Sequence, residues 1–158
     1  MNLFLLNILL ACVWMLLNGD YASEDFLIGF LVGFLALSLT QSFDNKPSYG
    51  KKFWAAVKLL TTFIVQLLIG SLEVVWDVLT PTHLSEPKII RIPLDAQSDF
   101  EITLLANLIS LTPGSLTLDV SEDKSHLIIH AMFAKDEEQI INDIKNSFER
   151  LVLEVTRD

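Results

Sequence analysis

Charge is distributed so unevenly along this chain that its two halves are expected to lie in different solvents. From residue 1 to residue 43 the only charged residues are Asp20, Glu24 and Asp25, which stand close together. From residue 88 to residue 158 there are seven Lys or Arg and thirteen Asp or Glu, which is typical of a water-soluble domain with an acidic bias. Because 51% of the 158 residues are hydrophobic, we predict a membrane segment joined to a soluble domain.

The predicted membrane segment begins with two apolar runs, residues 2–17 and 26–39, which hold no charged residue. With its polar flanks, each run reaches the roughly 17 to 25 residues that a helix needs to cross about 30 Å of hydrocarbon. A backbone in hydrocarbon must satisfy its own hydrogen bonds, so we predict a transmembrane helical hairpin over residues 1–42. A cleaved signal peptide is disfavoured, because no basic residue precedes the first run and no small-residue cleavage site follows it.

A third apolar run, residues 53–80, is long enough to span a membrane but carries polar and charged side chains. Each charged side chain that faced lipid would cost about 3 kcal/mol. Their spacing of three or four residues places them in one stripe along one helix face. The helix either crosses the membrane with this stripe turned towards partner subunits, or lies along the surface with the stripe in water. The stripe comprises Lys58, Thr62, Gln66, Gly70, Glu73 and Asp77.

The side of the membrane on which the C-terminal half lies depends on this choice. The basic connector over residues 43–52 carries three lysines, whereas the loop between the first two helices is acidic. Because positively charged loops stay in the cytoplasm, the connector is predicted to be cytoplasmic. A spanning third helix would then place the C-terminal half outside, and a helix lying flat would place it inside. The lone cysteine, Cys12, falls in the first membrane helix and forms no intrachain disulfide.

Residues 88–158 are predicted to form a small soluble α+β domain with the element order β-α-β-β-α. In its second strand, Leu116 and Leu118 alternate with polar residues. Asp119 is therefore predicted to point outward beside Thr117, towards water or a partner. The predicted elements are a strand over 88–94, a helix begun by the capping box of residues 98–101, strands over 116–120 and 127–133, and a helix from Asp136.

Between the first helix of this domain and its second strand stands the sequence Thr112-Pro113-Gly114-Ser115. A nucleophile elbow or a phosphate loop needs a strand that leads into a helix N-terminus. Here a helix C-terminus leads into the turn and presents carbonyl groups, which repel an anion. Thr112, Pro113 and Gly114 are therefore predicted to form a structural corner, in which Gly114 supplies the backbone freedom that ends a helix.

The histidines and the short motifs give no sign of a metal site or an active site. His126 and His130 share a strand face but lie about 13 Å apart at the usual rise per residue, so they cannot hold one ion. The sequence contains no Walker loop, dinucleotide fingerprint or HExxH motif, and its net charge of −9 argues against a nucleic-acid partner. We therefore predict no enzyme activity, no cofactor, no metal and no small-molecule substrate bound by this chain alone.

The sequence LLANLISLTPGSLTLDVSEDKSHLIIHA, with SFERLVLEV near the end, resembles the E subunit of the multisubunit Na+/H+ antiporters of the Mrp or Mnh type. The apolar run DFLIGFLVG and the total length are also similar, so the resemblance covers essentially the whole chain. It implies a small, non-catalytic, multi-pass subunit of the bacterial cell membrane, beside large subunits that exchange sodium for protons and support pH homeostasis. It also implies a cytoplasmic C-terminal domain, which favours a third helix that lies flat.

An accessory role agrees with the residues themselves. Ion-conducting helix bundles need ionisable groups near the membrane midplane, and the first two helices have none there, so this chain alone is not expected to move ions. Gly29 and Gly33 would let the hairpin pack closely against sibling subunits. Contacts to partner subunits are expected at Lys58, Gln66, Glu73 and Asp77, and structural or assembly roles at the corner and at Asp119.

Two other functions stay open at this point. A membrane-anchored adaptor would use its acidic domain to recruit a soluble partner. A small membrane-bound hydrolase would use Ser115, His126 or His130.

Overall fold

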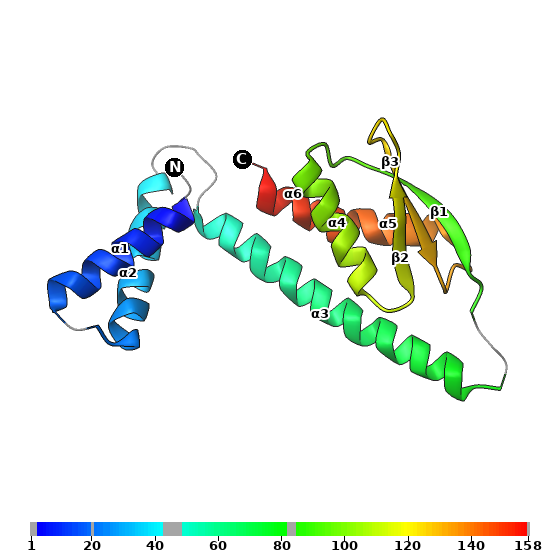
Figure 1. Ribbon diagram of the computed structural model, residues 1–158, viewed down its shortest axis with the longest axis horizontal. Helices are drawn as coiled ribbons and strands as arrows, with labels where there is room; N and C mark the ends of the chain where they lie inside the picture. The colour runs from blue at the N-terminus through cyan, green and yellow to red at the C-terminus, as the bar shows by residue number, and fades with distance from the viewer. Residues whose placement is uncertain (1–2, 20, 43–48, 82–84, 158) are drawn as a thin grey trace. The chain divides into compact units, whose positions relative to one another are not determined.

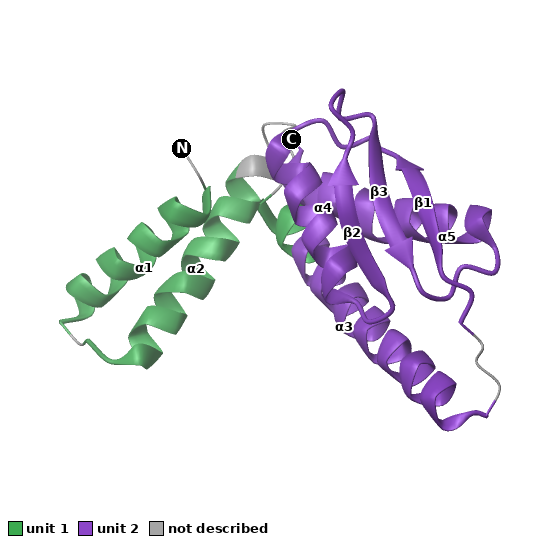
Figure 2. Ribbon diagram, turned by 45° about the vertical axis from the view of Figure 1, so that its right-hand side comes forward, with its two compact units in different colours: residues 1–54, 158 green, residues 55–157 purple. Residues whose placement is uncertain are grey.

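The computed structural model describes residues 3–19, 21–42, 49–81 and 85–157. Its helices and strands are labelled in Figure 1. The chain divides into two compact units, one of residues up to 54 and one of residues 55–157, which are coloured separately in Figure 2.

The first unit contains the helices α1 (Leu3–Asn18) and α2 (Ser23–Ser42), which lie side by side (Figure 1). Glu24 and Asp25 occupy the first turn of α2, where carboxylates suit the positive end of the helix dipole. With 16 residues, α1 is about 24 Å long. Among the described residues, the helices long and apolar enough to cross a membrane are α2 and α3, and α1 is shorter.

The long helix α3 extends from Tyr49 to Leu79, so it begins four residues before the predicted start at residue 53. Lys51 and Lys52 of the predicted connector therefore belong to the helix, while residues 43–48 lie outside the described part of the chain. The helix ends just before Pro81, which has no N–H to continue the hydrogen-bond ladder.

The C-terminal part of the second unit has the predicted element order β-α-β-β-α. Its strands form one antiparallel sheet of order β1-β3-β2. Ser98 begins α4 with a complete capping box, and Asp136 begins α5 by accepting the Gln139 N–H. The elements are β1 (Lys88–Pro93), α4 (Asp99–Leu111), β2 (Ser115–Val120), β3 (His126–Ala131), α5 (Glu137–Ile144), the π-helix η1 (Lys145–Glu149) and α6 (Arg150–Thr156).

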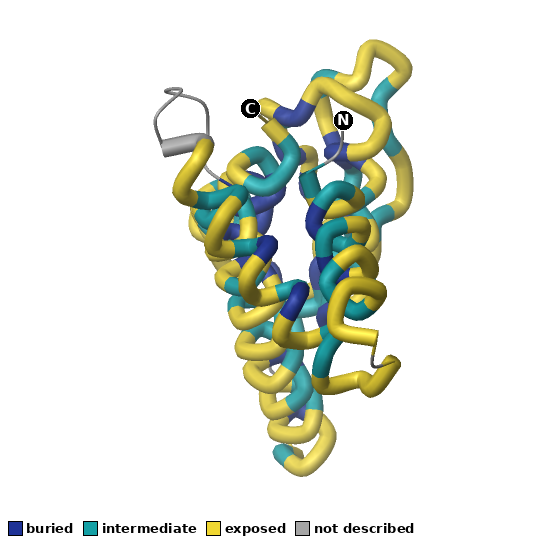
Figure 3. The backbone as a smooth tube through the Cα atoms, turned by 90° about the vertical axis from the view of Figure 1, so that its left-hand side faces the viewer, coloured by how far each residue is buried: buried dark blue, intermediate teal, exposed yellow. Residues whose placement is uncertain are grey.

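The core lies between one face of this sheet and the helices that cover it. The buried residues of β1 and β3 alternate with more exposed ones, and α4, η1 and α6 contribute further buried residues. Figure 3 colours the buried parts of the chain dark blue. Leu59 and Phe63 of α3 join the same cluster. Its most completely buried members are Ile90, Ile92, Leu105, Ile109, Leu127, Ile129 and Val152.

In strand β2 the two leucines and Thr117 point the opposite way from the prediction, whereas Asp119 is exposed as predicted. Leu116 and Leu118 are 51% and 49% exposed and lie on the open face of the sheet. Thr117 faces α4 instead, where its hydroxyl donates to the carbonyl of Ala106 at 3.1 Å. A bulge after Thr117 then shifts the register, so that Asp119 is exposed. The prediction of outward Thr117 was wrong because the hydroxyl has a partner in α4, and a polar group with a partner can be placed inside.

Candidate functional site

The corner after α4 is held by hydroxyl groups. Thr112 Oγ1 and Ser115 Oγ each donate to the carbonyl of Ile109 at 2.7 Å, and the two hydroxyl oxygens are 2.9 Å apart. Gly114 has a φ of +88°, which favours glycine, and its carbonyl accepts the Met132 N–H at 2.7 Å. Ser115 therefore donates to carbonyls at the end of a helix, where the helix itself supplies no N–H for them. A nucleophile would instead be aligned with a base.

The same corner touches the long helix. A Cβ atom added to Gly70 of α3 would lie 2.7 Å from the carbonyl oxygen of Pro113, closer than such atoms normally approach. One helical turn before and after, Gln66 and Glu73 line a groove of about 400 Å³ together with the corner and α5. Gly70 is thus a point of close approach between α3 and the α+β domain.

The predicted polar stripe of α3 faces the chain's own domain over most of its length. Asp77 is 2% exposed and accepts the Ser85 N–H at 3.1 Å. Leu59, one residue after the exposed Lys58, is buried in the domain core. The rest of the α3 surface is largely apolar and exposed, and it includes Trp54, Leu60, Ile64, Val65, Leu68, Leu72, Val75, Trp76 and Leu79.

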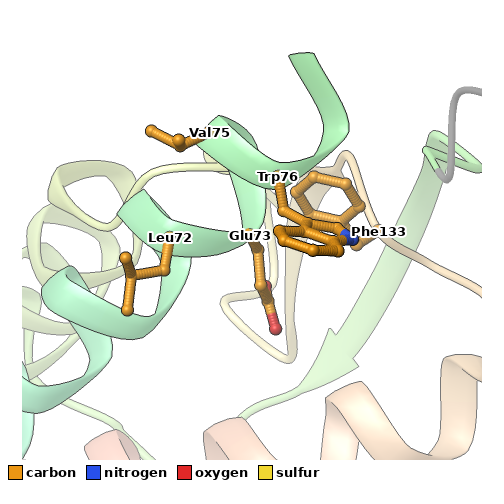
Figure 4. A pocket seen from close by; sticks show the side chains of 5 residues that line it. All are labelled: Leu72, Glu73, Val75, Trp76 and Phe133. Carbon is orange, nitrogen blue, oxygen red and sulfur yellow. The ribbon is translucent and has the colours of Figure 1, made fainter. Parts of the chain in front are cut away.

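A second depression, which we call the hollow, lies beside the C-terminal part of α3. It has a volume of about 560 Å³ and is lined by Leu72, Glu73, Val75, Trp76 and Phe133 (Figure 4). Four of these residues come from α3, and Phe133 comes from the segment after β3. Glu73 and Phe133 also line the groove, so the apolar hollow and the more polar groove share a wall.

A buried carboxylate anchors the loop between β1 and α4. Glu149 is 1% exposed and accepts the backbone N–H groups of Asp95 and Ala96 at 2.6 and 3.0 Å. Lys145 donates to Glu149 at 3.0 Å, to Asp95 at 2.9 Å and to the carbonyl of Pro93 at 2.8 Å. Partial burial opposes the charge of Lys145, but its bonds to Asp95 and Glu149 prevail and raise its pKa. Lys145 and Glu149 both belong to the π-helix η1, a form often found at functional sites.

A second buried carboxylate joins the last helix to the start of α4. Glu101 accepts from Arg157 at 3.0 and 3.2 Å, from Thr156 at 3.1 Å, and from the N–H groups of Gln97 and Ser98. The hydrogen bond from Arg157 is the main reason that the pKa of Glu101 falls to about 2. The sequence indicated only the capping role of Glu101 and did not reveal Glu149, for which the spacing of Lys145 and Glu149 was the one available signal.

The hairpin glycines allow close helix contact within the first unit. A Cβ on Gly29 would lie 2.7 Å from Cβ of Trp14, and one on Gly33 would overlap Oδ1 of Asn7. Asn7 is fully buried, and within the described residues its amide has no hydrogen-bond partner. The two glycines predicted to contact sibling subunits therefore pack against α1.

The hydroxyl and imidazole groups considered for a hydrolase are not arranged as a triad. Ser115, the hydroxyl considered for this role, donates to the carbonyls of Ile109 and Thr112. Nδ1 of His126 lies 2.6 Å from Oγ of a different serine, Ser125, and the nearby Asp123 accepts from Ser125 and does not orient the histidine. His130 lies on the open face of the sheet. Across the described residues, no three His, Cys, Asp or Glu side chains are grouped so as to hold a metal ion.

Comparison with known proteins identifies the family. Residues 7–155 match the model of a family described as Na+/H+ ion antiporter subunit. The chain is 39% identical over 153 residues to the E subunit of the Na+/H+ antiporter of Alkalihalophilus pseudofirmus, and the match covers 97% of each protein.

Two solved structures are also similar. One is a chain of the Mrp complex from a Dietzia species, with 29% identity and a TM-score of 0.51, which covers 63% of this chain and 93% of that chain. The other is a chain of an archaeal membrane-bound sulfane sulfur reductase, which at 23% identity supports the fold alone, with a TM-score of 0.57 over 96% and 98% of the two chains. The chain therefore belongs to the family of E subunits of Na+/H+ antiporters.

Proposed function

We propose that this chain is a non-catalytic accessory subunit of a multisubunit Na+/H+ antiporter complex in the bacterial membrane. Its partners are the other subunits of that complex, in line with the names of its relatives and with the Mrp complex in which a similar chain is found. The role of the chain is to support assembly, and thereby sodium extrusion and pH homeostasis by the complex.

The observation that carries this proposal is the placement of ionisable groups. Helix α1 contains no Asp, Glu, Lys, Arg or His, and the acidic residues of α2 are Glu24 and Asp25 in its first turn. Proton and sodium relays need such groups near the midplane of the membrane. Buried Asn7 and the close contacts at Gly29 and Gly33 suit a rigid anchor instead.

The second unit favours a surface position for α3. Between Leu59 and Asp77 one face of this helix is covered by a domain that carries many charges, and such a domain cannot enter hydrocarbon. The opposite, apolar face suits the boundary between headgroups and acyl chains. In the proposed topology, α1 and α2 cross the membrane, α3 lies along its surface, and the domain is on the cytoplasmic side with Lys51 and Lys52.

Cysteine accessibility tests this topology. In a Cys12→Ala background, Ser125→Cys in the turn between β2 and β3 is expected to react with a membrane-impermeant maleimide only after the cells are permeabilised. Ser23→Cys, at the predicted outer end of α2, serves as the matched control and is expected to react in intact cells. Labelling of Ser125→Cys in intact cells would place the domain outside and require α3 to span.

The adaptor function retains one supporting observation. Ile89, Leu116 and Leu118 form an exposed apolar area on the open face of the sheet, which a protein could cover. Purification in mild detergent separates the two functions, because an antiporter subunit is expected to co-purify with sibling membrane proteins. A chain that elutes without other membrane proteins, but with a soluble one, would favour the adaptor.

A further inference from the structure

The hollow beside α3 has the features of a site for one apolar chain. Three of its five lining residues, Leu72, Val75 and Trp76, belong to the exposed apolar face of α3 and are more than half exposed. In Figure 4, Glu73 and Trp76 extend from the helix towards the side on which Phe133 lies, while Leu72 and Val75 extend elsewhere. Phe133 forms the wall contributed by the α+β domain, so the hollow exists only where domain and helix meet.

The adjoining groove is polar, and its charges are unbalanced. Thr112, Ser115 and Ser147 bring hydroxyl groups to it, and Gln66 and Gln139 bring amides. Its charged lining residues are one cation, Lys135, and three carboxylates, Glu73, Asp136 and Asp143. A ligand that reaches from the hollow into the groove therefore meets an apolar region first, and then a region with one cation and three carboxylates.

We infer that the hollow and the groove together bind one membrane phospholipid, with an acyl chain in the hollow and an ammonium-bearing headgroup at Glu73. This inference rests on the proposed surface position of α3, which turns the hollow towards the acyl chains of the bilayer. The zwitterionic headgroup matches the groove, because Lys135 suits the phosphate and the carboxylates suit the ammonium group. A lipid with net negative charge would meet the excess of carboxylates and bind less well.

The experiment uses the fluorescence of single tryptophans in the full chain. The chain has three tryptophans, and the double variant Trp14→Phe, Trp54→Phe leaves Trp76 in the hollow. The protein is placed in phosphatidylcholine vesicles that contain small fractions of acyl-brominated phosphatidylethanolamine or phosphatidylglycerol, since bromine quenches only tryptophans that it touches. The variant that keeps only Trp54 is the matched control, because this residue is 63% exposed on α3, against 65% for Trp76, but does not line the hollow.

Trp76 is expected to be quenched at about two- to fivefold lower fractions of phosphatidylethanolamine than of phosphatidylglycerol, the range of one partly exposed charge contact. Trp54 lies one helical turn from Lys51 and Lys58, which attract anionic lipid, so it is expected to show no preference for phosphatidylethanolamine over phosphatidylglycerol. Glu73→Lys should reverse the preference at Trp76, whereas Glu122→Lys, the same charge change at an exposed turn, should leave it unchanged.

The outcomes separate the lipid site from the topology. Equal quenching of Trp76 by both lipids would overturn the site while leaving α3 in contact with the bilayer. Absence of quenching of both tryptophans would overturn the surface position of α3 and the lipid site with it. An unchanged preference in Glu73→Lys would refute the assignment of the headgroup to Glu73.

Discussion

The contact between α3 and the corner predicts that Gly70→Ala destabilises the joint, although alanine is the better helix former. In an isolated helix this substitution would be stabilising by about 1 kcal/mol. Here the new Cβ would lie 2.7 Å from the carbonyl oxygen of Pro113, well inside the roughly 3.3 Å of a close carbon–oxygen contact. Overpacking of this kind costs about 1 to 3 kcal/mol, which leaves a net destabilisation of about 1 kcal/mol.

Amide hydrogen exchange measures this change where it acts. The N–H groups of Ser115 and Met132 bond within and beside the corner, to the carbonyls of Thr112 and Gly114. A loss of about 1 kcal/mol should speed their exchange about fivefold when exchange proceeds through local opening. Thr61→Ala, at an exposed position of α3, raises helix propensity without touching the domain and should leave these amides unchanged. Slower or unaltered exchange at the corner in Gly70→Ala would refute the close contact.

Three further changes probe the domain and the assembly. Lys145→Met should lower the free energy of unfolding by about 3 kcal/mol in denaturant titrations, because it leaves the buried charge of Glu149 without its cation. The control Arg150→Met breaks an exposed ion pair and should cost under about 1 kcal/mol, and equal effects of the two variants would contradict the burial of Glu149. Since the pKa of Glu101 is lowered to about 2 in the folded chain, its contribution to stability is present above about pH 4.5 and is lost as pH falls towards 2. Glu101→Gln should therefore flatten the dependence of the free energy of unfolding on pH in this range, and an unchanged dependence would mean that other carboxylates dominate. Gly114→Val forces a branched side chain into a φ of +88° and should lower the yield of assembled complex without changing its apparent Na+ affinity. Normal yield with an altered Na+ affinity would contradict an assembly role of the corner.

Local signals made much of the fold predictable. The capping box at Ser98 depends on residues three apart, and both of its hydrogen bonds are present. The order of strands and helices follows from short runs of alternating or helical hydrophobicity, which each strand and helix carries within itself. The Pro-Gly corner was predictable for the same reason, because a helix that meets proline and glycine must end.

Features that depend on distant partners were not predictable. Thr117 points inward because its hydroxyl reaches Ala106 in a neighbouring element, which alternation within β2 cannot reveal. Glu149 is buried because a loop more than fifty residues earlier presents two N–H groups to it. The polar stripe of α3 was visible in the sequence, but what covers it was not, since a polar face can meet water, another protein or the chain's own domain.

Reconstitution of the purified chain in liposomes tests most directly whether it supports transport without performing it. With an imposed pH gradient and a fluorescent pH indicator inside the vesicles, the chain alone is predicted to give no sodium-dependent proton movement, because neither α1 nor α2 holds an Asp, Glu, Lys, Arg or His beyond the first turn of α2. The complete complex in the same vesicles is predicted to give such movement. Sodium-dependent proton flux from the chain alone would contradict the accessory role.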